Sequence, residues 1–542
     1  MLATIVLGAA VTGRWRSNSG VAKLLTIART PGLCWRQSRL TAVCVLAVIV
    51  GGCNLDWEKP DLSTPPPEKF REAHATSAGP IASGRDFVAK FGSRELTSLI
   101  DQALVDNLDI AAAAARIREA DAQARIASAP LWPTVSMQDI VRTNRAAGTT
   151  LNLASAATGF NTGSTSSSSL TPTTFRGRNF GFFQLGVAAA SYTVDFWGVN
   201  EDASYASRIL ANASRFDRDV VEISTVTAIM NAYFQVLTAQ DRLRIARNNV
   251  AIAEKVNAAI QARFQVGTAS ALDTAQQETV LARQRASIPP LEQTLRQTSN
   301  TLAVLLGRAP ESIQIKGGSL NQLKFPKIDP GLPSEVLLRR PDVARAEAQL
   351  AAQEFSVLQA RAAFFPSITL LGLYGPQSAL IANLLRPEAL AWQAASQLTQ
   401  PLFDGYFLQG QYENQKGRYA ELAALYRKQI ITALSETENA LIAIKETGRQ
   451  LKLQAAAVDA SRRAFEAANM RLQEGTIDII TMSVTQNDYF TAQEQEVLVR
   501  LNYFTAATSL YQALGGGWSP TTRNAEIARA NAAYEENKGP WP

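Results

Sequence analysis

Cysteine and histidine are almost absent from this 542-residue chain. The three cysteines, Cys34, Cys44 and Cys53, all lie near the N-terminus, and the single histidine is His74. No thiol follows Cys53, and one histidine in a proline-rich stretch is more typical of a solvated loop residue than of a ligand. We therefore do not expect thiol catalysis, histidine acid–base catalysis or Cys/His metal sites.

Residues 53–542 also lack an excess of positive charge. The formal net charge is +6, but six of the 53 Lys and Arg residues lie in residues 1–52, which contain no Asp or Glu. The remaining 47 basic residues equal the 47 acidic residues in number. No basic run interleaved with aromatic residues follows, so nucleic acid is not an expected partner. The sequence also lacks a GxxxxGK[ST] phosphate-binding loop and a metal-ligand cluster, so we expect no catalytic residue, no cofactor and no metal.

Residues 1–52 have the order of an export signal. A basic stretch ends at Arg39, and the apolar run 40–50 that follows is too short to span a bilayer as a helix. Val50-Gly51-Gly52-Cys53 then resembles a bacterial lipobox, in which the cysteine is acylated. We expect a removed signal over 1–52 and a lipidated N-terminal leader over 53–92. The alternative is a chance Gly-Gly-Cys inside a signal.

The strongest pattern in the chain is an internal repeat. A shift of 208 positions superposes Arg263–Thr268 on Arg471–Thr476, and Leu306-Gly307 on Leu514-Gly515, without a gap. Further upstream the shift is 233, which places Trp132-Pro133 on Phe365-Pro366. The difference of 25 residues indicates an insertion in the first copy. The Ser/Thr/Gly-rich stretch 148–174 is the candidate, and its composition predicts a loop.

Each copy is expected to contain a helix, two strands, a very long helix, a tight turn and a returning helix. The first helix is expected over 93–129, and the strands over 134–142, 180–196, 367–375 and 391–403. Strands of this length cross a membrane at barrel tilt, and aromatic residues cluster near their ends, as in barrel girdles. The stretches 198–263 and 405–471 contain no proline, so each predicts a helix about 100 Å long. A soluble coiled-coil rod would explain the helices but not the strand pairs.

Several motifs taken in order carry a family resemblance. They are Tyr192–Gly198, Arg339–Val343, Ala362–Ile368, Gln400–Gly405 and Leu510–Trp518. With them the chain resembles the TolC-like outer-membrane efflux factors, specifically the NodT-like lipoprotein branch paired with resistance-nodulation-division (RND) pumps. The resemblance covers Cys53 to about Trp518.

The resemblance implies a mixed fold, a membrane β-barrel joined to a long α-helical barrel. The chain would be the internally duplicated protomer of a trimeric channel, with four strands per protomer. The segments would be a first repeat at 93–312, an equatorial linker at 313–333, a second repeat at 334–518 and a C-terminal equatorial segment at 519–542. The implied function is a passive outer-membrane duct for small molecules, lipid-anchored, with a periplasmic helical tunnel. Its implied partners are a periplasmic adaptor, an inner-membrane RND pump and outer-membrane lipid. The alternative is a non-conducting periplasmic coiled-coil lipoprotein.

The resemblance also implies two kinds of site. Gly267-Thr268 and Gly475-Thr476 would form the tip turns where the adaptor docks, although they could be turns only. Asp273, Ile480 and Val484 would narrow the pore just above these tips. In the second copy Thr481 replaces the carboxylate equivalent to Asp273, and Val484 occupies a position where many relatives have aspartate. The alternative for Asp273 is that it caps the start of the returning helix.

Overall fold

The computed structural model describes residues 57–63, 65, 67, 69–71, 84–145, 179–326, 332–519 and 528. Cys53 and the stretch 148–174 lie outside these residues. The chain divides into a unit that ends at Lys59 and a second unit, Pro60–Pro542. The description below concerns the second unit.

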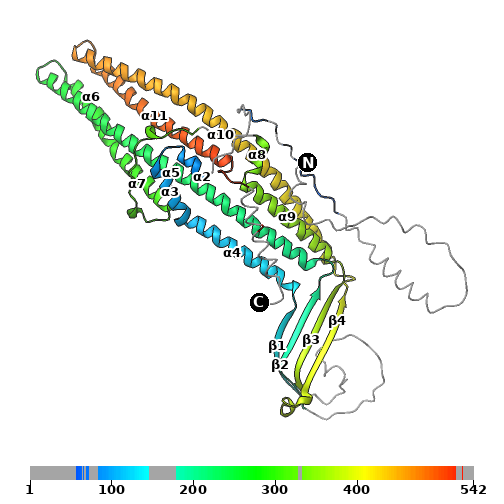
Figure 1. The fold of residues 1–542 in the computed structure, drawn as a ribbon. Coiled ribbons are helices and arrows are strands. Elements are labelled where there is room, and N and C mark those ends of the chain that lie inside the picture. The colour runs from blue at the N-terminus through cyan, green and yellow to red at the C-terminus, as the bar shows by residue number, and fades with distance from the viewer. Residues whose placement is uncertain are drawn as a thin grey trace, which may run out of the picture. The chain divides into compact units, whose positions relative to one another are not determined.

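Four antiparallel strands form one sheet in the order β1-β2-β3-β4 (Figure 1). Their bounds are β1 Thr134–Arg145, β2 Asn179–Val194, β3 Ser367–Ser378 and β4 Leu390–Thr399. The four predicted strands are confirmed, but β1 and β3 extend past the predicted ends, while β2 and β4 stop short. The shortening has a local cause, because Asp195 and Asp404 accept backbone hydrogen bonds from the helices that follow. In this sheet β1 and β4 are edge strands, and no strand of the described residues pairs with either outer edge.

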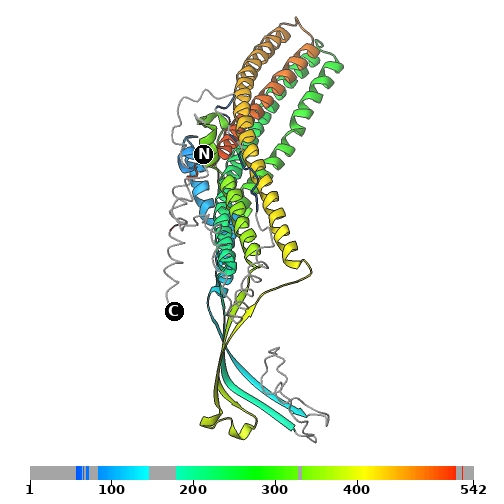
Figure 2. The same ribbon diagram turned by 90° about the vertical axis from the view of Figure 1, so that its right-hand side faces the viewer.

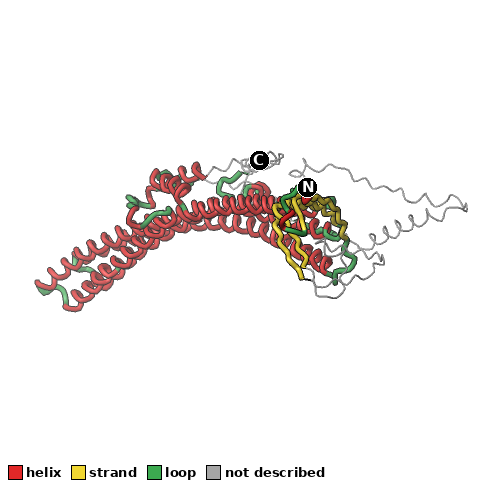
Figure 3. Tube along the Cα trace, turned by 90° about the horizontal axis from the view of Figure 1, so that it is seen from below, coloured by secondary structure: helices red, strands yellow, loops and turns green. Residues whose placement is uncertain are grey.

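Two helices of 67 residues each connect the sheet to the opposite end of the bundle. They are α5 (Val199–Gln265) and α10 (Phe407–Gln473), as the two proline-free stretches predict. Each is followed by a returning segment, α6 (Ala271–Ala286) with α7 (Ile288–Leu305) in one case and α11 (Ile479–Ala513) in the other. Figures 2 and 3 show the strands at one end of these helices and the turns at the other. The returning segment breaks at Ser287 because Pro289 and Pro290 lack a backbone N–H.

The helix predicted over 93–129 is divided in the structure. It consists of α3 (Arg94–Asp106) and α4 (Leu108–Ser128), and α9 (Pro341–Ala362) precedes β3 in the second half. Asn107 separates α3 from α4, with an extended backbone and a side chain that accepts hydrogen bonds from the backbone N–H groups of Asp109 and Ile110. The continuous helix was therefore a wrong prediction, because an N-cap residue begins a second helix at this point. Two short helices, α2 (Gly84–Ala89) and α8 (Pro333–Leu338), complete the helical part that we discuss.

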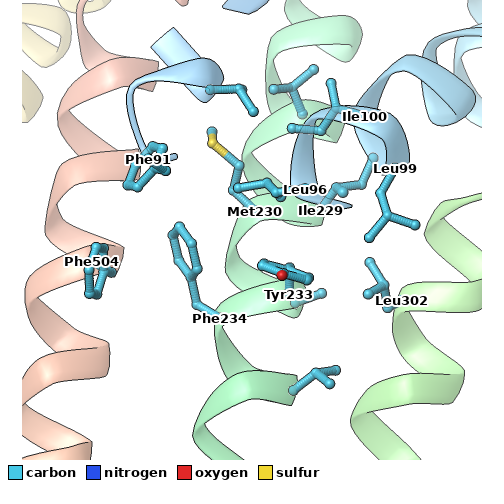
Figure 4. Close-up of a cluster of buried hydrophobic side chains, with 14 of the residues drawn as sticks. Phe91, Leu96, Leu99, Ile100, Ile229, Met230, Tyr233, Phe234, Leu302 and Phe504 are labelled. Carbon is cyan, nitrogen blue, oxygen red and sulfur yellow. The ribbon is translucent and has the colours of Figure 1, made fainter. Parts of the chain in front are cut away.

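The main core lies midway along the helices. Phe91, Leu96, Ile100 and neighbours from α2 and α3 pack on Met230, Phe234 and adjacent residues of α5 and on Phe504 of α11 (Figure 4). Segment 313–326 adds Ile313, Ile315, Leu323 and Phe325 to this core. One stretch of α5 is long and apolar enough to cross a membrane, but 56% of it is buried in the bundle, which is typical of a core helix.

Candidate functional site

The two turns farthest from the sheet have the same backbone geometry. Gly267 and Gly475 have φ of 76° and 78°, a left-handed conformation that glycine adopts without a Cβ penalty. Thr268 donates its backbone N–H to the carbonyl of Arg263, at 2.9 Å, and Thr476 donates to that of Arg471, at 3.0 Å. In both turns the threonine hydroxyl also donates to that carbonyl, at 3.1 Å. These are Schellman caps that end α5 and α10, and they account for the Gly-Thr pair in each copy.

The two turns are tied to each other. The Arg263 guanidinium donates a hydrogen bond to the carbonyl of Gln473, at 3.2 Å. Just above them, Val256 and Ile260 of α5 pack with Leu472 of α10 and with Ile479 and Met482 of α11. The four predicted tip residues, Gly267, Thr268, Gly475 and Thr476, therefore lie at one end of one packed unit.

Asp273 forms a capping box at the start of α6. Its carboxylate accepts hydrogen bonds from the backbone N–H and the hydroxyl of Ser270, at 2.8 and 2.9 Å, while its own N–H donates to the Ser270 hydroxyl. This geometry is the capping role that the sequence left open. The two hydrogen bonds from Ser270 engage only one carboxylate oxygen of Asp273, and the residue remains partly exposed.

A second carboxylate at this level was missed in the sequence. Asp478 is the N-cap of α11, and its side chain accepts the backbone N–H of Thr481 at 2.8 Å. Hydrogen bonds from the side chain and backbone of Thr481 lower the pKa of Asp478, so the exposed carboxylate is charged at neutral pH. It occupies the position of Ser270 under the 208-residue shift, three residues before Thr481, the counterpart of Asp273. The N-cap preference for Asp was the signal that could have found it.

Ile480 and Val484 share the exposed face of α11. They are 55% and 54% exposed, whereas Ile479 and Met482, on the other face, are buried in the cluster near the turns. Leu272 is the counterpart of Ile480 in the first copy and is 64% exposed. It too was missed, since a single leucine carries no signal by itself. The start of each returning helix thus presents one exposed apolar residue beside one carboxylate, in an arrangement that could narrow a pore.

The described residues include no group of three or more His, Cys, Asp or Glu side chains placed to hold a metal ion. The described residues thus form a sheet whose outer edges lack a partner strand, two long helices and two turns of the same geometry.

Comparison with known proteins agrees with this architecture. The family model described as "Outer membrane efflux protein" matches residues 99–308 and 332–516. The chain is 35% identical to the pyoverdine export outer membrane protein OpmQ of Pseudomonas aeruginosa, over 88% of this chain and 96% of that protein. It is 30% identical to the probable efflux pump outer membrane protein TtgC of Pseudomonas putida, over 92% of this chain and 99% of that protein.

Solved structures show the same fold. The outer-membrane channel OprN superposes with a TM-score of 0.76 at 24% identity, covering 86% of this chain and 99% of that one. A structure of CusC superposes with a TM-score of 0.72 at 23% identity, covering 85% and 99%. The family match spans both halves of the chain, including both pairs of long helices and both tip turns. The chain belongs to the outer membrane efflux protein family.

Proposed function

We propose that this chain is one protomer of a trimeric outer-membrane duct that receives small molecules from an inner-membrane RND pump through a periplasmic adaptor. The observation that carries this proposal is the sheet, whose two edges have no partner strand among the described residues while its strands are long enough to cross a membrane. Exposed sheet edges are not tolerated in lipid, so the four strands require further strands to close a barrel. Three copies would supply twelve.

Two exposed apolar residues of β1 support the membrane role of the sheet. Val135 and Met137, two positions apart on β1, lie on one face and are 67% and 76% exposed. Exposed apolar side chains at alternate positions are typical of strands whose outer face contacts lipid.

Structural equivalences between the two halves support an internal duplication. Under the 208-residue shift, the caps at Gly267 and Gly475 coincide, as do the caps at Gly307 and Gly515. A helical barrel built from six near-equivalent helical hairpins would continue the membrane barrel as a tunnel.

The proposed duct needs no catalytic group, because the pump would supply the energy. The relatives have names that refer to pyoverdine, toluene and cation efflux, so they do not share one cargo. We therefore propose cargo only as small molecules selected by the pump.

The described part of the N-terminal leader runs along α10. The carbonyl of Ser63 accepts a hydrogen bond from Arg427, and the backbone N–H of Arg71 donates to Glu438, so this part follows α10 away from the sheet. Acylation of Cys53 is proposed from the lipobox pattern of the sequence alone.

Single-channel recording in planar bilayers tests the proposal directly. The purified protein should give stepwise conductance, and deletion of its gene should sensitise the cell to compounds that the matching pump exports. A protein that assembles and reaches the outer membrane but never conducts would instead be the non-conducting structural lipoprotein.

The tips test the adaptor role separately. Gly475→Pro removes the N–H that donates to the carbonyl of Leu472 and cannot adopt the positive φ, so the turn cannot form. We expect lost efflux and lost adaptor pull-down with trimers still in the outer membrane. Gly417→Pro, ten residues after the start of α10, is the control for general helix damage and should abolish assembly itself. Full efflux in Gly475→Pro would exclude the tip from adaptor docking.

A further inference from the structure

A group of large apolar side chains follows β4 without a partner in the described chain. Leu402 and Phe403 are 81% and 82% exposed, and Tyr406 and Phe407 are 74% and 63% exposed. Phe403 and Tyr406 contact each other edge to face, with ring centroids 6.2 Å apart. We call these two residues the aromatic pair.

Tyr406 is also held in an unfavourable backbone conformation. Its φ is 67°, and among the described residues it is the one non-glycine with positive φ. It begins α10 in the position that Gly198, with φ of 81°, has at the start of α5. A left-handed conformation is unfavourable for a residue with a Cβ, so a tyrosine at this position calls for a compensating contact.

The equivalent junction inside the chain shows what such an aromatic residue can do. Trp197, which follows β2, stacks on Phe365, which precedes β3, with ring centroids 4.6 Å apart. The indole N–H of Trp197 donates to the carbonyl of Pro366, at 2.9 Å. Strands β2 and β3 are paired, with Val194 opposite Ile368, so the contact secures the point where paired strands meet the helices.

The repeat transfers this contact to the two free edges of the sheet. Tyr406 lies between the helix-capping Asp404 and the first residue of α10, as Trp197 lies between Asp195 and the first residue of α5, although Tyr406 is one residue nearer to its helix. Trp132 precedes the edge strand β1 and occupies the position of Phe365 under the 233-residue shift. If β4 of one copy pairs antiparallel with β1 of another, the end of β4 lies beside the start of β1. The aromatic pair then faces Trp132.

A small pocket lies at that place. It is lined by Leu131, Trp132, Glu201, Ser204, Tyr205 and Arg208. Trp132 is 50% exposed, and the Ser204 hydroxyl, although buried, has no hydrogen-bond partner among the described residues. Arg208 lies over the ring of Tyr205, 5.4 Å from its centroid. An aromatic wall with polar groups at its base matches a tyrosine, whose ring is apolar and whose hydroxyl needs a partner.

We propose that the aromatic pair Phe403–Tyr406 of one protomer docks onto Trp132 in this pocket of a second copy of the chain. The inference rests on the trimer proposed above and adds the residues that join one protomer to the next at the membrane end of the tunnel. The occupant is the same chain because the contact has a counterpart within it, at Trp197 and Phe365.

Cysteine cross-linking of the full chain in outer membranes tests the contact. Trp132→Cys with Tyr406→Cys should give covalent dimers and trimers on non-reducing gels under mild oxidation, whereas each single variant gives none. Trp197→Cys with Phe365→Cys is the matched control, which should link within one chain and leave its size unchanged. Native mass spectrometry under reducing conditions reports the trimer independently. If the double variant is trimeric under reducing conditions but gives no cross-link under oxidation, the docking proposal alone is overturned. If the unsubstituted chain is monomeric, both proposals are overturned.

A double-mutant cycle measures the contact without cysteines. Trp132→Ala and Tyr406→Ala should each speed trimer dissociation in detergent about tenfold, as loss of an aromatic pair implies. The combined variant should be no faster than either alone. Phe264→Ala, an exposed aromatic position near the tips, is the control and should leave the rate unchanged. Additive effects of the two junction substitutions would show that the side chains do not meet, and would overturn the proposal.

Discussion

The side-chain amide of Asn107 donates a hydrogen bond to the carbonyl oxygen of Leu305, at 2.7 Å. In the second half of the chain Arg340 occupies the position of Asn107 and donates to the carbonyl of Ala513, at 3.0 Å. Ala513 is Leu305 shifted by 208 positions. Two different side chains thus make equivalent hydrogen bonds in the two halves. Each bond joins the end of a returning helix to the start of the helix that leads to the sheet.

Asn107→Ala should destabilise the protein by about 2–3 kcal/mol. The substitution removes the N-cap of α4 and leaves the partly buried carbonyl of Leu305 without this donor. Asn107→Ser is the matched variant, because serine keeps the cap acceptor and loses only the bond to Leu305. We expect it to lose about half as much stability in chemical denaturation. Equal losses in both variants would mean that the cap contributes nothing.

Gly515→Ala should be far more damaging than a glycine substitution within a helix. A Cβ at Gly515 would collide with the backbone carbonyl of Arg339, and its φ is 84°. Strain and overpacking together should lower the free energy of unfolding by about 2–5 kcal/mol. Gly417→Ala has open space around the new Cβ inside α10 and should stabilise the helix by about 0.5–1 kcal/mol. Similar unfolding midpoints for the two variants would contradict this account.

These contacts also show what could be predicted from sequence. The repeat, the four strands and the two long helices were predictable because periodicity, strand length and the absence of proline are local signals. The break at Asn107 was not predicted, since an alanine-rich pattern continues across it and the cap depends on one amide. Asp478 was not predicted because the repeat aligns Asp273 with Thr481, whereas the second copy has its carboxylate at the N-cap. The proposed partner of Tyr406 lies in another copy of the chain, and the repeat points to it only once the two edges of the sheet are known.

Cys53→Ser should abolish palmitate labelling and slow maturation, yet leave some assembled trimer. An acyl chain contributes about 0.8 kcal/mol per buried CH₂ group, but the barrel is the stronger attachment. Phe70 is buried against Val336, Ala440 and Leu510, which holds the leader on the helices whether or not the lipid is present. Metabolic labelling and membrane fractionation measure these outcomes. Labelling that survives in Cys53→Ser would refute acylation at this residue.

Asp202 should make stability depend on pH between about 4 and 6. Burial, together with the nearby charges of Glu201 and Asp195, raises the pKa of Asp202 to about 6 from its ordinary 3.8. The folded state therefore holds this proton at pH values where the unfolded chain has lost it. Stability from this group is complete below pH 3.8 and is lost as the pH rises to about 6. Asp202→Asn should raise the unfolding midpoint at pH 7 and flatten its change over this interval. An unchanged pH profile would show that Asp202 is ionised throughout.

The last prediction concerns the constriction that we propose near the tips, where each half presents a carboxylate and an exposed apolar residue. In a trimer, Asp273 and Asp478 would form two rings of negative charge. These rings favour cations because they repel anions and because a cation offsets the repulsion between the carboxylates. Asp273 also caps α6, so substitution of Asp273 alone cannot separate the effect of its charge on the pore from the effect of losing the cap. Asp478→Asn keeps an N-cap acceptor and removes only the charge, since asparagine caps a helix as well as aspartate does.

Single-channel recording of Asp478→Asn, Asp273→Asn and Ile480→Ala therefore separates capping from gating. Gating predicts reduced cation selectivity in both asparagine variants, and larger conductance in Ile480→Ala because a side chain that is 55% exposed in the single chain no longer narrows the pore. Capping alone predicts unchanged selectivity in all three, with lower thermal stability only in Asp273→Asn, whose carboxylate accepts both the N–H and the hydroxyl of Ser270. Selectivity lost in Asp478→Asn without any loss of stability would assign that carboxylate to the pore, because its cap is intact and only its charge is gone.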